Sequence, residues 1–185
     1  MAPVRAALAA AVAEAWDVLA LPPPPSTGVC KGCCMDPDIE AAFLGFEARD
    51  LPLSHVRDWY FAAYADDLGH AQMGWLLPRV LELLAAGEEP SFFGLETTLA
   101  RLPQAGFPGD WPEPAVRAVR RFAHAWLATV VEERRPDLDE TLCMIGAAGL
   151  DIGPFLHQLD ALEDGALIAL DNRYACVATS KQCYV

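Results

Sequence analysis

Apolar side chains recur at helical spacing along most of the chain, and this pattern predicts an all-α fold. The first apolar stripe consists of Val4, Leu8, Val12, Ala15 and Leu19, which lie on one face of a helix that ends before a run of prolines. No segment alternates apolar and polar residues over the length of a half-buried strand. Ala and Leu together outnumber the β-branched residues Val, Ile and Thr, which also favours helices over strands.

Cap and turn residues divide the remaining chain into further helices. Asp36 before Pro37 indicates a helix start, residues 92–102 are expected to form another helix, and the longest helix is expected to begin at Pro112. With a final short pair that ends near residue 177, the count is about eight helices. Short loops between successive helices predict stacked antiparallel helical hairpins in a single domain.

The expected organisation has four parts: an N-terminal helix over residues 1–21, a Pro-rich strut with a Cys loop over 22–35, a helical body over 36–178, and a tail over 179–185. A chain of 185 residues suits one compact domain. We expect the N-terminal helix to dock in its own chain, because a tethered segment has a high effective concentration. Exchange of this helix between protomers is the alternative.

Acidic residues number 26 and Lys with Arg number 13, so the formal net charge is −13. Nucleic acid and anionic membrane surfaces repel a body of this charge, whereas a basic protein is attracted to it. No uncharged apolar stretch approaches the roughly 18 residues that a membrane span needs. Because Glu14 and Asp17 interrupt the Ala-rich start, we interpret it as a mature helix rather than a signal peptide, and we expect a cytoplasmic protein.

The most unusual local motif is Cys30-Lys-Gly-Cys33-Cys34, which follows the proline run. Two thiolates at this spacing can bind one Zn²⁺, but a structural zinc site needs four ligands. Cys176 and Cys183 complete such a site if the C-terminal tail returns to this loop. In the alternative interpretation these residues are thiols without a metal, and Cys34 is a reactive surface thiol near a helix start.

A cluster of aromatic residues between positions 59 and 75 allows two interpretations. It is typical of a helix buried between two neighbours, or else Tyr60 and Tyr64 line a groove together with His70. Asp66, Asp67 and His70 also resemble half of a di-iron bundle motif, but the sequence has no second acidic-x-x-His motif. We therefore interpret the two aspartates as helix-end residues rather than as metal ligands.

Positive charge gathers on the outer face of the longest expected helix, at Arg117, Arg120, Arg121 and His124. In so acidic a protein, this cluster is a candidate site for an anion or an acidic partner. The alternative is an ordinary solvated helix face with cations near the helix end.

Several short motifs follow one another in the chain. They are the Cys-x-x-Cys-Cys segment, Arg49-Asp50-Leu51 followed by Trp59-Tyr60, the stretch Leu77-Pro78-Arg79-Val80-Leu81-Glu82-Leu83-Leu84, and Ala105-Gly106-Phe107 followed by Trp111-Pro112. This order resembles an uncharacterised family of bacterial all-helical proteins with an N-terminal Cys-x-x-Cys-Cys segment. The resemblance covers residues 30–160 and implies an all-helical fold, but it implies no activity and no site residues.

The sequence contains no motif for nucleophilic catalysis, phosphate binding or dinucleotide binding, which disfavours an enzyme. Small size and negative charge instead favour a cytoplasmic module that binds a basic protein, for example an inhibitor or immunity protein for a basic toxin. The alternative is a zinc-binding or thiol protein centred on the Cys30–Cys34 loop, with Zn as its cofactor. A helical enzyme with a pocket near Tyr60, Tyr64 and His70 is the third hypothesis.

Overall fold

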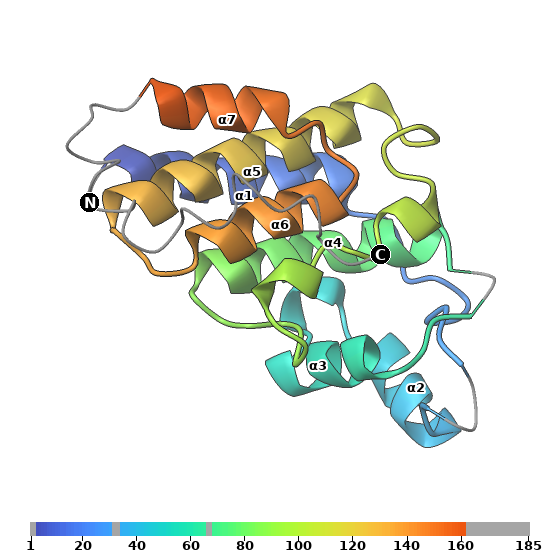
Figure 1. Cartoon of the computed structure of the whole chain (residues 1–185). Coiled ribbons are helices and arrows are strands. Elements are labelled where there is room, and N and C mark those ends of the chain that lie inside the picture. The colour runs from blue at the N-terminus through green and yellow to red at the C-terminus, as the bar shows by residue number, and fades with distance from the viewer. Residues whose placement is uncertain (1–2, 31–33, 66–67, 162–185) are drawn as a thin grey trace.

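The computed structural model describes residues 3–30, 34–65 and 68–161 (Figure 1). Within these ranges the chain forms seven α-helices and three short 3-10 turns, and no strand. The α-helices are α1 (Pro3–Leu19), α2 (Pro37–Leu44), α3 (Leu53–Phe61), α4 (His70–Ala85), α5 (Glu113–Glu132), α6 (Leu138–Ala147) and α7 (Gly153–Asp160), and the 3-10 turns are η1 (Ala48–Asp50), η2 (Leu95–Thr97) and η3 (Pro103–Ala105). The all-α fold expected from the sequence is therefore confirmed.

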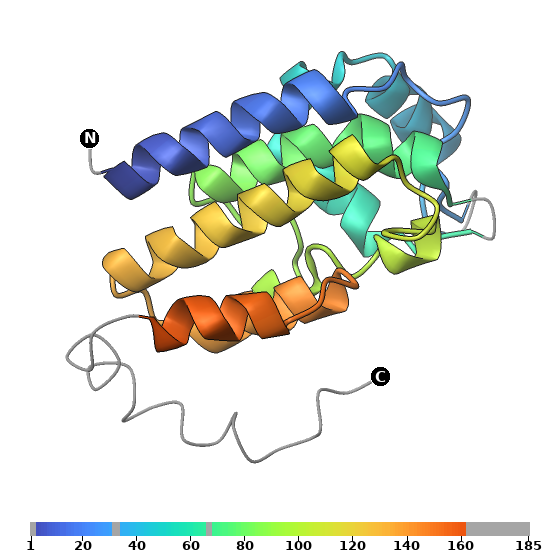
Figure 2. The same ribbon diagram turned by 90° about the horizontal axis from the view of Figure 1, so that it is seen from above.

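The N-terminal helix α1 packs in its own chain, against α5 and α4 (Figure 2). Its buried side chains are Leu8, Ala11, Val12, Ala15 and Leu19. Most of the expected apolar stripe therefore faces the core, and burial of these side chains stabilises the docked helix through the hydrophobic effect.

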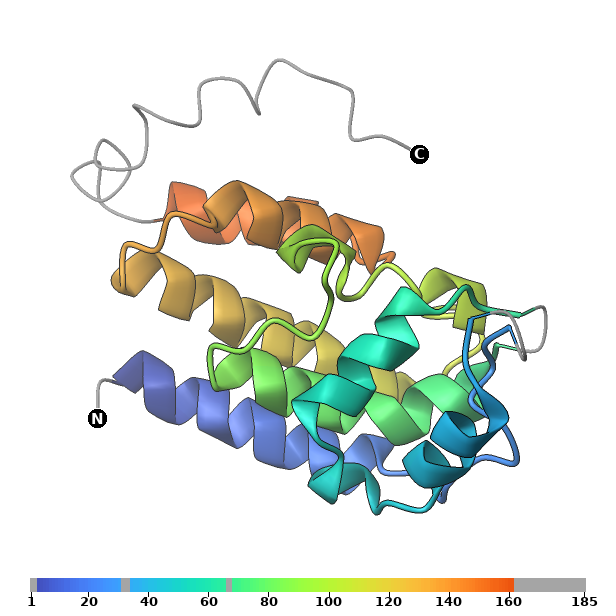
Figure 3. The ribbon, with the colours of Figure 1, turned by 90° about the horizontal axis from the view of Figure 1, so that it is seen from below.

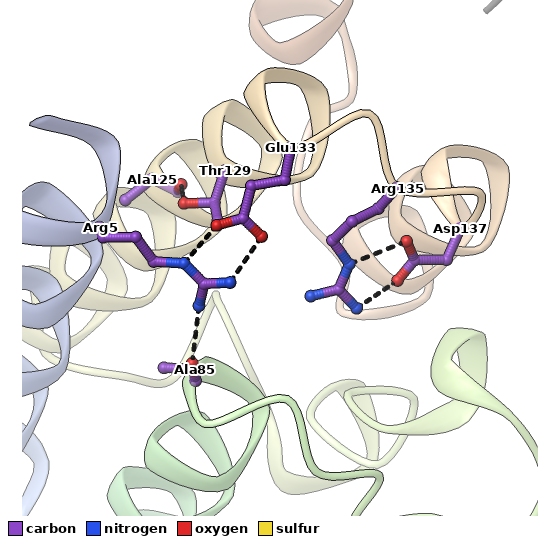
Figure 4. A network of polar contacts seen from close by, with 7 residues as sticks. All are labelled: Arg5, Ala85, Ala125, Thr129, Glu133, Arg135 and Asp137. Atoms are coloured by element: carbon purple, nitrogen blue, oxygen red, sulfur yellow. Dashed lines mark hydrogen bonds and ion pairs between the residues drawn. The ribbon is translucent and has the colours of Figure 1, made fainter. Parts of the chain in front are cut away.

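Two ion pairs establish that α1 and α5 run antiparallel. Glu14 near the end of α1 accepts a hydrogen bond of 2.7 Å from Arg121, and Arg5 at the start of α1 pairs with Glu133, which follows α5 (Figure 4). Arg5 also donates to the carbonyl oxygen of Ala85 at the end of α4, at 3.3 Å. The start of α1 therefore meets the ends of both α4 and α5, so α4 and α5 run parallel to each other.

The central helix of the fold is α4, whose side chains are buried on nearly every side. A helix that is apolar around most of its surface packs between several neighbours rather than against one. Pro78 lies inside α4, and the helix continues past it. At the end of α4, Gly87 has a φ of +82°, the left-handed conformation that commonly terminates a helix.

The last two described helices, α6 and α7, lie on the side of α5 opposite α1 (Figure 2). Trp126 of α5 donates through its indole nitrogen to the hydroxyl of Thr141 in α6, at 3.3 Å. His124 of α5 stacks on Phe155 of α7 with ring centroids 4.1 Å apart, and its Nδ1 lies 2.6 Å from the side-chain oxygen of Gln158. Helix α5 therefore packs against α1 on one side and against α6 and α7 on the other.

Helix α3 crosses α4, and α2 lies next to α3 (Figure 3). The segment between α1 and α2 is attached to the end of α3 by hydrogen bonds. The indole nitrogen of Trp59 donates to the carbonyl oxygen of Thr27 at 2.9 Å, and the backbone nitrogen of Cys30 donates to the carbonyl oxygen of Ala63 at 2.7 Å. The residues that follow the proline run are therefore part of the packed body.

The residues that precede α2 and α6, Asp36 and Asp137, differ in whether they cap their helices. The carboxylate of Asp36 accepts a bond of 2.8 Å from the backbone nitrogen of Asp38, and Pro37 lies in the first turn of α2, as predicted. Asp137 precedes α6 but makes no capping bond, because both of its carboxylate oxygens accept from Arg135. The charge-assisted pair replaces the cap.

Residues 92–102 do not form the expected helix; they contain η2 and further turns. Gly94 interrupts any helix here with a φ of +100° and a ψ of 162°. The side chains of Ser91 and Thr97 bond to nearby backbone groups, which is the usual way in which such residues compete with a helix. The apolar residues of this segment, among them Leu99 and Leu102, are nonetheless buried.

The expected helix over residues 164–177 and the tail over 179–185 lie outside the described residues. The count of about eight helices and their arrangement as stacked hairpins therefore stay predictions. Among the described helices, none is both long and apolar enough to cross a membrane.

Candidate binding surface

A cleft opens between the end of α4, residues 88–96 and the start of α6, and we call it the acidic cleft. It encloses about 170 Å³. Its lining residues are Leu84, Gly87, Glu88, Glu89, Gly94, Leu95, Glu96, Trp126, Arg135, Asp137 and Glu140. Small-molecule sites typically enclose roughly 300–1,000 Å³, so the size of this cleft suits the end of one side chain better than a whole cofactor.

Negative charge in the acidic cleft is concentrated around Glu140. Burial raises the pKa of this carboxyl group, and the neighbouring carboxylates raise it further, in decreasing order Asp139, Glu96, Asp137 and Glu89. A pKa raised by like charges means that the ionised cluster is electrostatically strained and favours an added cation.

Arg135 is the only cation among the residues that line the acidic cleft, and it is already engaged. Its guanidinium donates to both carboxylate oxygens of Asp137, at 3.1 and 2.6 Å (Figure 4), and lies 4.6 Å from the ring centroid of Trp126. Within the described residues, Glu89, Glu96 and Glu140 form no salt bridge. With Glu88, which also lines the cleft and forms no salt bridge within the described residues, four carboxylates of the cleft are not neutralised by this part of the chain.

The loop that carries Glu96 is held by its own hydrogen bonds. The hydroxyls of Ser91 and Thr97 lie 2.7 Å apart, and the backbone nitrogen of Phe93 donates to Ser91 Oγ at 3.1 Å. The left-handed φ of Gly94 favours glycine, and a Cβ there would clash with the carboxylate of Glu96. These bonds and the conformation of Gly94 place Glu96 at the cleft.

The same segment is bound to the end of α3 through Arg101. The guanidinium of Arg101 donates to the carbonyl oxygens of Trp59 at 2.9 Å, Tyr60 at 2.8 Å and Ala62 at 2.5 Å. In the reverse direction, the hydroxyl of Tyr60 donates to the carbonyl oxygen of Thr98. Burial lowers the pKa of Arg101, and the nearby tyrosines oppose this shift. These bonds satisfy the terminal carbonyls of α3, which otherwise lack partners within the helix.

Tyr60, Tyr64 and His70 do not line a common groove in the structure. Tyr60 is only 4% exposed, so it belongs to the core. Tyr64 is half exposed, and its ring centroid lies 5.8 Å from the guanidinium of Arg101. His70 packs the edge of its ring against Trp111, with centroids 4.5 Å apart. The aromatic cluster mainly forms packing contacts, the first of the two interpretations.

The expected anion patch on α5 is reduced by pairing. Arg121 pairs with Glu14 at 2.7 Å, and Arg117 lies 3.6 Å from the carboxylate of Glu113. Arg120 is exposed on the same helix. His124 is half-buried against α7, as described above, so it does not share the solvated face with the arginines. This geometry is typical of a solvated helix face, and an anion site on it stays a prediction.

Of the four predicted zinc ligands, the structure describes only Cys30, which is disulfide-bonded. Cys33, Cys176 and Cys183 lie outside the described residues, as do Asp66 and Asp67. Over residues 3–30, 34–65 and 68–161, no group of three or more His, Cys, Asp or Glu side chains is arranged to hold a metal ion. The zinc site therefore stays a prediction that requires reduced Cys30.

Sequence reasoning did not single out the residues of the acidic cleft. Glu89, Glu96 and Glu140 are separated along the chain, and only the turns of residues 88–97 bring them together. The available signal was a pair of turn-forming residues: Pro90, just before the expected helix over residues 92–102, and Gly94 inside it. No protein-family model, curated protein or solved structure matches this chain.

Proposed function

We propose that this protein is a non-enzymatic module that binds a basic protein partner, and that its acidic cleft receives a cationic side chain of that partner. The observation that carries the proposal is the convergence of Glu89, Glu96 and Glu140 around one cleft without a salt bridge in the described part of the chain. A lysine or arginine placed between these carboxylates relieves their mutual repulsion.

The size of the cleft and the charge of the whole chain support the same proposal. A cleft of about 170 Å³ has room for the end of a side chain. The net charge of −13 attracts a basic protein from a distance and accelerates association at low ionic strength. We propose a cytoplasmic inhibitor or immunity protein for a basic toxin as one form of this function, which engages neither nucleic acid nor membranes.

Binding of a fluorescently labelled arginine-rich peptide, measured by anisotropy, tests this proposal. The variant Glu96→Gln/Glu140→Gln removes two charges of the cleft, and the matched control Asp17→Asn/Glu132→Gln removes two exposed charges on α1 and α5. We expect the cleft variant to bind about tenfold more weakly, while the control binds within about twofold of the wild type. Equal affinities of the cleft variant and the control contradict the proposal.

The second candidate function is a zinc-binding or thiol protein centred on the Cys30–Cys34 loop. It is favoured by the backbone bond that attaches Cys30 to Ala63 and by the exposed position of Cys34. Elemental analysis of protein purified under reducing conditions without added metal tests this function. Less than about a tenth of an equivalent of zinc, with unchanged stability in a chelator, rules out a structural zinc site.

We also infer that the helical body continues past residue 161, with about eight helices in stacked antiparallel hairpins, as the helical spacing of apolar residues and the short loops of the sequence predict. Backbone chemical shifts over residues 164–177 test this inference. Helical shifts support the eighth helix, and coil shifts contradict it.

A further inference from the structure

Three phenylalanine rings lie exposed next to the acidic cleft, and we call them the aromatic patch. Phe61 is 67% exposed, Phe92 63% and Phe93 57%. Phe61 of α3 and Phe93 stack with centroids 6.2 Å apart and planes 8° from parallel. Both rings therefore stay more than half exposed even after they have packed on each other.

The aromatic patch is held in place by the surrounding backbone. Phe93 belongs to the loop closed by the hydroxyls of Ser91 and Thr97, and Phe61 ends the helix whose carbonyls Arg101 binds. The rings of the aromatic patch therefore remain exposed to solvent, although hydrogen bonds hold both the loop and the end of α3. A cluster of exposed apolar side chains on a fixed framework is typical of an interaction surface.

The aromatic patch and the acidic cleft share one segment of chain. Phe92 and Phe93 directly precede Gly94 and Glu96 of the cleft lining. At the other side, Arg57 of α3 lies 5.2 Å from the ring of Phe92 and donates to the carbonyl oxygen of Glu89 at 2.9 Å. Exposed rings and two carboxylates that form no salt bridge within the described residues therefore lie in one segment, residues 89–96, to which Arg57 is bonded.

We propose that the aromatic patch and the acidic cleft together bind one segment of a basic protein, in which an apolar side chain stands next to arginine or lysine. The apolar side chain packs on Phe61 and Phe93, and the cationic side chain enters among Glu89, Glu96 and Glu140. Charge complementarity selects this occupant, because nucleic acid, anionic lipid and a second copy of this acidic chain are all repelled. This inference rests on the proposed function and adds the apolar half of the recognition.

Two labelled peptides of equal charge test the inference. One is rich in arginine and leucine, and in the other each leucine is replaced by serine. We expect the wild-type protein to bind the leucine peptide about tenfold more tightly than the serine peptide at low salt. In Phe61→Ser/Phe93→Ser this preference disappears, while affinity for the serine peptide stays the same. The control Leu156→Ser, which changes an exposed apolar residue of α7, keeps the preference.

The outcomes separate this inference from the proposed function. If the wild type binds both peptides equally, or if Phe61→Ser/Phe93→Ser keeps the preference, the apolar half of the recognition is wrong and the charge-based function stands. If neither peptide binds at low salt, the proposed function fails and this inference fails with it. Concentration-dependent self-association that is lost in Phe61→Ser/Phe93→Ser assigns the patch to a second copy and also overturns the inference.

Discussion

The guanidinium of Arg101 lies 4.3 Å from the ring centroid of Trp59 and also donates a hydrogen bond of 2.9 Å to the carbonyl oxygen of that residue. A single cation thus stacks on the last turn of α3 and satisfies its backbone. A positive charge at the carboxyl end of a helix is favourably placed in the field of the helix dipole. Because α3 carries Phe61 and the segment before Arg101 carries Phe93, this contact positions both stacked rings of the aromatic patch.

The first prediction concerns Arg101 itself. Arg101→Met keeps much of the apolar stem but removes the donors to Trp59, Tyr60 and Ala62, so it should lower the free energy of unfolding by about 2–4 kcal/mol. Urea unfolding measures this loss. The exposed Arg120 supplies the control, since Arg120→Met should change stability by less than about 0.5 kcal/mol. Equal stabilities of the two variants contradict the role given to Arg101.

The second prediction concerns stability at alkaline pH. Burial raises the pKa of Tyr60, and the positive charge of Arg101 opposes this shift. The unfolded chain therefore loses the phenolic proton first, so this contribution to stability is present below pH about 10 and is lost as the pH rises further. Tyr60→Phe should remove this part of the loss of stability at alkaline pH. At neutral pH it should lower the free energy of unfolding by about 1 kcal/mol, because the hydrogen bond to Thr98 is lost. Tyr64→Phe, at a half-exposed position, should retain the wild-type alkaline profile, and unfolding midpoints measured over a pH series decide between these outcomes.

The third prediction tests the docking of α1. Leu8 is 2% exposed, so Leu8→Asp places an unpaired charge in an apolar interface and should destabilise the protein by about 3 kcal/mol or more. Ala9→Asp puts the same charge on the exposed side of the same helix. It should therefore cost less than about 1 kcal/mol. Matching melting temperatures of the two variants would mean that α1 is not docked.

The fourth prediction follows from the carboxylates around Glu140. Partial burial and then repulsion by these carboxylates raise the pKa of Glu140, so the folded state retains its proton to a higher pH than the unfolded chain does. Stability contributed by the neutral carboxyl is therefore lost as the pH rises through this raised pKa. Glu140→Gln should increase stability at neutral pH by less than about 1 kcal/mol, because the site is largely solvated. The gain should vanish in acid, where Glu140 is protonated in both states, and an equal gain at both pH values would contradict this account.

Helices with a strong periodic pattern were predictable from the sequence, whereas the candidate site was not. The stripe that contains Leu8 and Leu19 identified α1, and Asp36 with Pro37 located the start of α2. The prediction of a helix over residues 92–102 was wrong, because the conformation of Gly94 and local side-chain hydrogen bonds outweigh a short apolar pattern.

The candidate site depends on contacts that no local pattern encodes. Arg101 donates to carbonyl oxygens about 40 positions earlier in the chain. The hydroxyl of Tyr60 donates to the carbonyl oxygen of Thr98, which is 38 positions later. Glu96 lies in η2 and Glu140 in the first turn of α6, and each alone resembles an ordinary surface carboxylate. Only the tertiary structure places them at one cleft.

Amide chemical-shift mapping with the arginine- and leucine-rich peptide tests the central claim most directly, because it locates binding without a mutation. We expect the largest changes at residues 89–97, at the end of α3 around Phe61 and at the start of α6 around Glu140. These changes should saturate with peptide concentration and weaken as salt is added, since the cationic half of recognition is screened. Changes centred on the exposed face of α1 or α7, or spread evenly over the surface, would contradict a binding surface made of the acidic cleft and the aromatic patch.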